Sequence, residues 1–305
     1  MGEAAKGFWA LVAACTVWGL SPLYYKLLAE VPPLQVLAHR TLWSLAFFGL
    51  VVVSSGKLRE VRAAFLGRGA AITALSSVLI SANWLVFIWA VQVGRTFDAS
   101  MGYFLFPLVA VVLGVAVLGE RLGPLQWLAV ALAAAAVALL AFGLGALPWV
   151  ALTLAVTFGL YGLVKKRLAV SPLVSVTAEV LLLAPLAFGW LGWIATKGGA
   201  AMGGDARTLA LLAFSGVLTG GPLMLFAYAA RRVRMATLGL VQYLNPLLQF
   251  LCAVAVFAEP FTPWHRAAFA LIWVALALYS GAGLFQPKAV ASRDSSAATS
   301  GSSST

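Results

Sequence analysis

Long apolar runs, separated by short turns, repeat along the chain from Phe8 almost to the C-terminal end. Each run is about 20 residues long, which is the length an α-helix needs to cross the hydrocarbon core of a bilayer. Helix breakers such as Pro32-Pro33 and Gly123-Pro124 stand in the turns. The pattern predicts ten transmembrane helices, at residues 7–28, 34–54, 70–93, 98–119, 125–145, 147–165, 173–195, 208–230, 235–257 and 264–285.

The composition supports an all-α polytopic membrane protein. Of the 305 residues, 63% are hydrophobic and 10% are charged, against about 25% charged in ordinary soluble domains. The mean hydropathy is +1.00. The first apolar run is long enough to span and lacks a small-residue cleavage site, so we expect it to stay in the mature protein. Both cysteines, Cys15 and Cys252, lie inside spans, and we expect no disulfide framework, metal site or cofactor.

The basic residues form short clusters between the predicted spans. Under the ten-helix count, one side holds 14 of the 20 Lys and Arg residues: Lys6, Lys57, Arg59, Arg62, Arg68, Arg121, Lys165, Lys166, Arg167, Arg231, Arg232, Arg234, Lys288 and Arg293. The positive-inside rule then places both termini in the cytoplasm. We expect the protein in the plasma (inner) membrane. This topology signal explains the net charge of +11 better than nucleic-acid binding does. The Ser-, Thr- and Gly-rich tail, residues 286–305, is expected to be disordered.

Weak internal similarity divides the chain into two units. Pro107 precedes Glu120 by thirteen residues, as Pro246 precedes Glu259, and the two pairs are offset by 139 residues. Similar offsets lay Trp18-Gly19-Leu20 over Phe158-Gly159-Leu160, and Pro33 with Arg40 over Pro172 with Glu179. Each unit, 1–145 and 146–285, contains five predicted helices, so the second enters the membrane in the opposite sense. Inverted repeats of this kind are typical of secondary transporters, whose substrate site lies where the units meet.

Several stretches also carry a family resemblance. VWGLSPLYYKLL, HRTLWS, SANWLVFIWAV, SMGYFLFPL, LGERLGPLQWLAV, AVTFGLYGLVKK and TLGLVQYLNP occur in this order, and they resemble the RarD branch of the EamA family in the drug/metabolite transporter superfamily. The resemblance covers about residues 7–284. It implies ten helices in two inverted halves around a central cavity, alternating access, and export of small metabolites, amino acids or drugs. The chloramphenicol-sensitivity label often attached to this branch does not define a substrate.

Arg40 stands about seven residues into an otherwise apolar helix. Charge at this depth is costly, so we expect Arg40 to face a wet cavity, either as a ligand for a substrate carboxylate or as a structural ion-pair partner. His39 is a candidate proton or substrate group, against the alternative of a hydrogen-bonding structural histidine. Glu179 is the corresponding charge of the second unit and a candidate for proton coupling. Because the repeat is inverted, we expect Arg40 and Glu179 at opposite depths and no direct salt bridge.

Other polar and aromatic residues inside the spans complete the predicted site. Polar groups in hydrocarbon either join helices or line a path, since unsatisfied ones are costly. The predicted substrate-binding set is Trp18, His39, Arg40, Asn83, Trp84, Tyr103, Tyr161, Gln242, Tyr243 and Asn245. Prolines interrupt helical hydrogen bonding, so they are either hinges or static kinks. The hinge candidates are Pro22, Pro107, Pro222 and Pro246.

The sequence carries neither a catalytic motif nor a phosphate-binding loop, so an enzyme is not expected. A carrier that exports small metabolites fits best, and amino acids or related zwitterions fit a cavity with one cation, carboxamides and aromatic walls. Its expected partners are the small-molecule substrate and the lipid bilayer; proton coupling is possible and a monomer suffices. A passive channel or facilitator, or a multidrug exporter of amphipathic compounds, is the alternative function.

Overall fold

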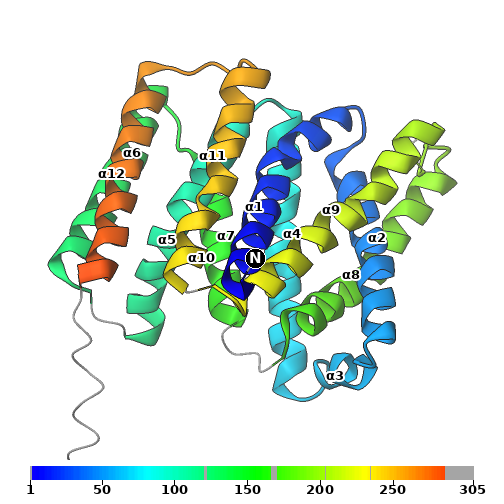
Figure 1. Cartoon of the computed structure of the whole chain (residues 1–305). Helices are drawn as coiled ribbons and strands as arrows, with labels where there is room; N and C mark the ends of the chain where they lie inside the picture. Colours follow the sequence, from blue (N-terminus) through cyan, green and yellow to red (C-terminus); the bar gives the residue numbers. More distant parts are fainter. Residues whose placement is uncertain (1, 120–121, 166–169, 203, 234, 286–305) are drawn as a thin grey trace, which may run out of the picture.

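The computed structural model describes every residue except 1, 120–121, 166–169, 203, 234 and 286–305, and its described regular structure is helical (Figure 1). Glu120, Arg121, Lys166, Arg167, Arg234, Lys288, Arg293 and the tail predicted to be disordered lie outside the described residues. The helices are α1 (Glu3–Leu27), α2 (Pro33–Ser54), α3 (Leu58–Ala63), α4 (Arg68–Gln92), α5 (Thr96–Leu118), α6 (Pro124–Leu144), α7 (Trp149–Lys165), α8 (Pro172–Thr196), α9 (Ala206–Ala230), α10 (Met235–Gln242), α11 (Leu244–Leu251), the π-helical turn η1 (Cys252–Val256) and α12 (Pro263–Phe285).

Eight of these segments are long and apolar enough to cross a membrane by length and composition alone. They are α1, α2, α4, α5, α6, α8, α9 and the stretch Thr237–Val256. Helix α7 is apolar but has 17 residues, and α12 carries His265 and Arg266 in its first turn. All ten predicted stretches coincide with helix, while the short α3 was not predicted. The chain is therefore a multi-pass α-helical membrane protein.

Proline and glycine set many helix boundaries. Helices α2, α6 and α8 each begin with a proline, at Pro33, Pro124 and Pro172. Proline suits the first helical position because its missing N–H would have no intrahelical acceptor there. Helices α5 and α6 end at Gly119 and Gly145, whose φ angles are +67° and +62°. Only a residue without a Cβ adopts this left-handed conformation at no steric cost, so both helices end there.

The helices pack in pairs that are related across the two predicted units. Helix α1 packs against α9 and α11, and α7, its counterpart in the second unit, packs against α4 and α5. Helix α2 packs against α8 and α9, and α8 packs against α2 and α4. The pairs α5 with α11 and α6 with α12 each join a helix to its own counterpart. Figure 1 shows α6 and α12 along one edge of the bundle, and α2, α8 and α9 along the other.

Small residues let these helices approach closely. A Cβ on Gly19 would lie 2.7 Å from Cβ of Leu248 in α11, and one on Gly102 would lie 2.8 Å from the carbonyl oxygen of Ala151 in α7. Gly159 of α7 abuts Val109 of α5 in the same way that Gly19 abuts Leu248. Lipid tails are as apolar as leucine, so close packing of this kind drives helix association in membranes.

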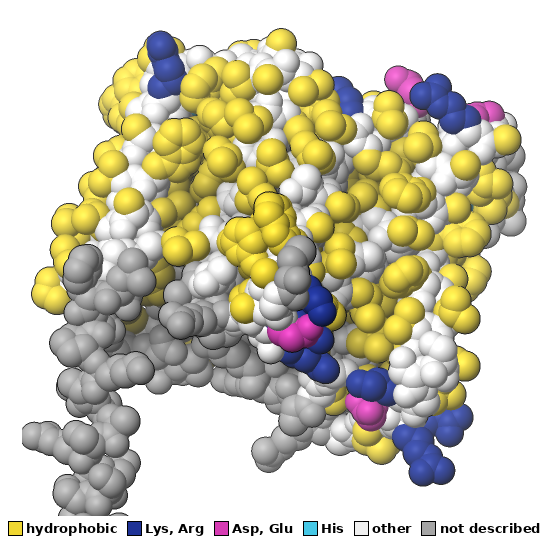
Figure 2. All heavy atoms as spheres, viewed as in Figure 1, with side chains coloured by type: hydrophobic (Ala, Val, Ile, Leu, Met, Phe, Trp, Pro, Cys, Tyr) yellow, Lys and Arg dark blue, Asp and Glu magenta, His cyan; other side chains and the backbone are white. Residues whose placement is uncertain are grey.

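Apolar side chains also cover the outer surface of the bundle. Phe142, Leu50 and Leu186 are 88%, 73% and 71% exposed. In Figure 2 apolar side chains cover the middle of the visible face, and Lys and Arg gather near the two ends. Exposed apolar surface of this extent needs a nonaqueous neighbour, which a lipid bilayer supplies. We call the end with α3 and the α9–α10 turn the basic end, because Lys57, Arg59, Arg62, Arg231 and Arg232 lie there.

The contact between α9 and α2 provides a test of this packing. A Cβ on Gly216 would overlap the backbone carbonyl of Trp43, whereas Gly221 in the same helix has open space around it. We expect Gly216→Ala to cost about 1 to 3 kcal/mol through overpacking and to lower the apparent melting temperature by roughly 2 to 4 °C per kcal/mol. Gly221→Ala, the matched control, should melt at or above the wild-type temperature in the same detergent. Equal melting of the two variants would contradict the packing described for α2 and α9.

Candidate functional site

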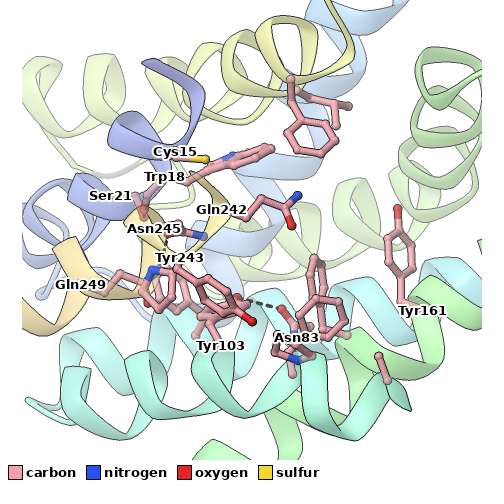
Figure 3. A pocket seen from close by; sticks show the side chains of 18 of the residues that line it. Cys15, Trp18, Ser21, Asn83, Tyr103, Tyr161, Gln242, Tyr243, Asn245 and Gln249 are labelled. Atoms are coloured by element: carbon pink, nitrogen blue, oxygen red, sulfur yellow. Dashed lines mark hydrogen bonds between the residues drawn. The ribbon is translucent and has the colours of Figure 1, made fainter. Parts of the chain in front are cut away.

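A central cavity of about 840 Å³ lies among helices of both units. Its wall combines aromatic rings with carboxamides, hydroxyls and the guanidinium of Arg40. In Figure 3 Cys15, Trp18 and Ser21 of α1 lie on one side, Gln242, Tyr243 and Asn245 lie beside them, and Tyr103 and Asn83 come from α5 and α4. Polar groups that converge in a mostly apolar hollow are typical of small-molecule sites.

Most of the predicted substrate-binding residues line this cavity. Those in its wall are Trp18, Arg40, Asn83, Trp84, Tyr103, Tyr161, Gln242, Tyr243 and Asn245. Two of the proposed hinges, Pro107 and Pro246, also lie in the wall. His39 and Glu179 do not line it, and each has other partners.

Arg40 is the charged residue of the cavity wall and is 7% exposed. Its Nε donates to Oγ1 of Thr219 in α9 at 2.9 Å, and its Nη1 donates to the hydroxyl of Tyr25 in α1 at 2.9 Å. The guanidinium carbon lies 3.9 Å from the centroid of the Trp84 ring in α4. Arginine stacks well on aromatic faces because its planar ion is weakly hydrated. These neutral neighbours hold the cation in place without neutralising it.

No acidic side chain pairs with Arg40 in the part of the chain that the structure describes. The ion pairs formed there are Lys6 with Glu3, Arg95 with Asp98, Lys165 with Glu179, and Arg232 with Glu3. The cavity wall contains neither Asp nor Glu among its described residues. Arg40 therefore presents an uncompensated positive charge to the cavity, as an anion-binding group would.

His39 serves a different purpose. It is 2% exposed, and its Nε2 lies 2.8 Å from the carbonyl oxygen of Ala201 in the loop between α8 and α9. Gln35, one turn earlier, donates to the carbonyls of Ala200 and Ala201 in the same loop. A carbonyl only accepts, so Nε2 of His39 carries the proton. The structure thus places His39 outside the cavity, in a contact that fastens α2 to this loop.

A hydrogen-bond network fixes the aromatic wall on the α4 and α5 side. The hydroxyl of Tyr103 donates to Oδ1 of Asn83 at 3.0 Å. Nδ2 of Asn83 in turn donates to the carbonyl of Leu154 and to Oγ1 of Thr157, both in α7. Asn83 is therefore fully engaged by protein groups, and it holds Tyr103 at the cavity surface while joining the two units.

The ninth predicted span is broken beside the cavity. Helix α10 ends at Gln242 and α11 begins at Leu244, so the break falls at Tyr243. Pro246 has no N–H to return to the carbonyl of Gln242, so this helical hydrogen bond is missing across the break. The carbonyl of Pro246 is bound by Oγ of Ser100 at 2.8 Å. The other proposed hinges, Pro22, Pro107 and Pro222, lie within continuous helices.

Glu179 lies in a second buried polar cluster. It is 1% exposed, and its Oε1 lies 2.6 Å from Nζ of Lys165 in α7. Ser76 of α4 donates to Oε1 at 2.8 Å, and Tyr161 donates to Oε2 at 3.1 Å. Lys165 also donates to Ser175. The carboxylate is thus neutralised by an ion pair, and Tyr161 connects it to the cavity wall.

The two clusters occupy corresponding places in the two units. Arg40 joins α2 to α1 and α9, and Glu179 joins α8 to α7 and α4. As expected from the sequence, no contact joins Arg40 to Glu179 among the described side chains. The charge pattern marks Lys165 only as a topology signal, but in the structure it is the ion-pair partner of Glu179. With the repeat offset of 139 residues, Lys165 lies close to the position that corresponds to Tyr25, which contacts Arg40. The repeat could therefore have suggested that Lys165 contacts Glu179.

Other cavity residues were not predicted from the sequence. They include Cys15, Ser21, Tyr25, Thr219, Gln249 and Ser280. The relevant signal is weak because serine, threonine and cysteine are common in helix contacts as well as in cavities. Gln249 did give a signal, since a carboxamide inside a span needs a partner.

The chain matches known proteins over nearly its whole length. The EamA-like transporter family matches twice, at residues 5–142 and 147–281. Protein RarD of Escherichia coli (strain K12) is 40% identical over 280 residues, which cover 91% of this chain and 94% of that protein. An "Uncharacterized transporter" of Vibrio cholerae is 39% identical over 284 residues, covering 92% of this chain and 94% of that protein.

A solved crystal structure shares the fold. It aligns with a TM-score of 0.62 at 19% identity, over 92% of this chain and 99% of the other. The family matches and the RarD relatives place the chain among multi-pass membrane transporters. The chain belongs to the EamA-like transporter family, and RarD proteins are among its relatives.

Because Lys165 and Glu179 form a buried ion pair, we predict that substitutions at the two residues have non-additive effects on thermal stability. Lys165→Met leaves a buried carboxylate unpaired, which costs about 3 to 5 kcal/mol; this corresponds to roughly 6 °C or more in apparent melting temperature. The double variant Lys165→Met/Glu179→Gln should melt closer to wild type than Lys165→Met does, because no uncompensated charge remains. A double variant at least as unstable as Lys165→Met would show that the residues act independently. Thermal melts of the four proteins in one detergent make this comparison.

Proposed function

We propose that the protein is a secondary transporter that exports small metabolites, with amino acids or related zwitterions as substrates, by alternating access around the central cavity. The family and the names of its relatives indicate transport. The observation that carries the substrate class is Arg40: a buried cation, lining the cavity, for which the described residues provide no anion. A substrate carboxylate would neutralise the charge of Arg40, and the planar guanidinium can hold both carboxylate oxygens.

The rest of the wall suits the other parts of an amino acid. Trp18, Trp84 and Tyr103 offer apolar and aromatic surface for a side chain. Carboxamides such as Gln242 and Asn245 offer hydrogen-bond acceptors for an ammonium group. A cavity of about 840 Å³ has room for a ligand of this size together with water.

Alternating access rests on the proposed inverted repeat of 1–145 and 146–285. Three observations support it: the family matches once in each unit, the helix pairs correspond between units, and so do the contacts of Gly19 and Gly159. The repeat implies ten spans, including α7 and α12.

Glu3 accepts a hydrogen bond from Arg232 at 2.9 Å, so the N-terminal helix begins beside a basic turn. By the positive-inside rule we assign the basic end, and both termini, to the cytoplasm of a plasma (inner) membrane protein.

The cavity extends toward the basic end. Gln126, near the start of α6, and Ser280, near the end of α12, lie on that side and belong to its wall. At the opposite end a buried cluster that includes Leu28, Val36, Val91 and Leu212 fills the bundle. A cavity closed at one end favours a carrier that faces the cytoplasm over a passive channel.

A multidrug exporter of amphipathic compounds is less favoured, because apolar drugs leave the charge of Arg40 unmatched. Glu179, bound to the cavity residue Tyr161, is the proposed coupling group if protons drive export.

Counterflow in proteoliposomes tests the substrate assignment. Vesicles preloaded with an unlabelled amino acid should accumulate the radiolabelled one, and a panel of amino acids identifies the substrate. We expect Arg40→Met to abolish this exchange. Arg40→Lys should reduce it by about tenfold or more, because lysine keeps the charge but loses the bidentate fork.

Arg95→Lys is the matched control, because Arg95 pairs with Asp98 outside the cavity. It should exchange like wild type. Unchanged exchange by Arg40→Met would contradict the proposed role of Arg40. Flux without acceleration by substrate on the opposite side would indicate a channel or facilitator instead of a carrier.

A further inference from the structure

Four buried side-chain nitrogen or oxygen atoms lack a hydrogen-bond partner in the described part of the chain: Oγ of Ser44, Oγ1 of Thr96, Nε1 of Trp190 and Oε1 of Gln249. Of these residues only Gln249 belongs to the cavity wall. Burying a carbonyl oxygen without a donor costs about 1 to 3 kcal/mol. A side chain that carries this cost at the edge of a binding cavity is a candidate for contact with the ligand.

Gln249 forms a pair with Asn245, one turn earlier in α11. Nε2 of Gln249 donates to Oδ1 of Asn245 at 2.9 Å, and both residues line the cavity, Gln249 at 2% exposure (Figure 3). The pair lies just after the break at Tyr243, in a segment held by the bond from Ser100 to the Pro246 carbonyl. Close packing of Gly19 against Leu248 fixes the same segment against α1. The pair is therefore carried on a well-anchored element.

The pair leaves one buried carbonyl oxygen without a donor. Nε2 of Gln249 donates to Oδ1 of Asn245, and Oε1 of Gln249 has no hydrogen-bond partner among the described residues. Because an amide oxygen only accepts, this atom needs an N–H or O–H donor from outside the pair.

We propose that the Asn245–Gln249 carboxamide pair is a subsite for the α-amino group of the substrate. The proposal rests on the proposed function and deepens it, since it separates amino acids from simple carboxylic acids. The described cavity wall has no Asp or Glu to attract an ammonium ion. A neutral carbonyl that lacks a donor is then the natural acceptor for an ammonium N–H. Arg40 binds the carboxylate of either ligand class, and the carboxamide pair distinguishes between them.

Matched ligands test this subsite. Phenylalanine and 3-phenylpropanoate, and likewise leucine and 4-methylpentanoate, differ in the amino group alone. Binding of each is measured by isothermal titration calorimetry on the full chain in lipid nanodiscs. Wild type should bind the amino acid of a pair more tightly by about ten- to hundredfold, the usual range for a hydrogen bond to a charged group. Asn245→Leu/Gln249→Met should reduce this ratio to about twofold or less, while it still binds the carboxylate.

Thermal stability separates recognition from a structural role. Replacing both members of a hydrogen-bonded pair by apolar groups is nearly neutral, and here it also removes the unpaired oxygen. The double variant should therefore melt at or above the wild-type temperature. Gln92→Met is the matched control outside the cavity, because Gln92 donates to the carbonyls of Leu28 and Val31. It should melt at a lower temperature and keep the wild-type ligand ratio.

The possible failures are distinguishable. If wild type binds both ligands of a pair equally, or if the double variant keeps the wild-type ratio, the subsite is wrong while the role of Arg40 stands. If the double variant melts well below wild type, the pair is a structural element and the proposal is overturned. If wild type binds none of the four ligands, the proposed substrate class itself is wrong, and the subsite is wrong with it.

Discussion

A charge inside a bilayer has to be hydrated, paired or bound, because the surrounding hydrocarbon solvates ions poorly. In this protein two charges at corresponding positions meet this requirement in different ways. Glu179 is paired with Lys165 inside a cluster of hydroxyls. Among the described residues Arg40 contacts neutral groups, and it lies in the wall of the central cavity. The broken ninth span and the aromatic wall surround that cavity, and its chemistry follows from the cation that it exposes.

The two clusters differ in charge: the Glu179 cluster contains an ion pair, and Arg40 is held by hydroxyl groups. A neutralised pair such as Lys165 and Glu179 holds three helices together and contributes no net charge to its surroundings. Arg40 also joins three helices, but no anion pairs with it among the described residues. In the proposed function the substrate supplies that anion, so binding energy is concentrated at one place in the cavity. The substrate then completes an interaction that the empty protein leaves incomplete.

The spans could be predicted from the sequence to within a few residues, because hydrophobic length is a strong signal: residues 173–195 were expected and α8 covers Pro172–Thr196. The break at Tyr243 was harder to foresee, since Pro246 and Pro107 look alike in sequence, yet α5 continues through Pro107. Which face of a span lines the cavity was also difficult to predict, because lipid and protein interior are equally apolar. His39 and Arg40 are adjacent and both polar, but they turn to different neighbours: His39 to the loop carbonyl of Ala201, Arg40 to the cavity.

The most direct measurement of the central claim is a distance between the guanidinium of Arg40 and the carboxylate of a bound ligand. Solid-state NMR of ¹⁵N-arginine-labelled protein in lipid, with a substrate labelled by ¹³C at its carboxylate carbon, gives this distance by dipolar recoupling. A direct ion pair predicts a separation of about 4 Å in wild type and loss of the coupling in Arg40→Lys, where the other arginines remain. A bound substrate whose carboxylate shows no coupling to arginine, or a coupling that persists in Arg40→Lys, would contradict the account.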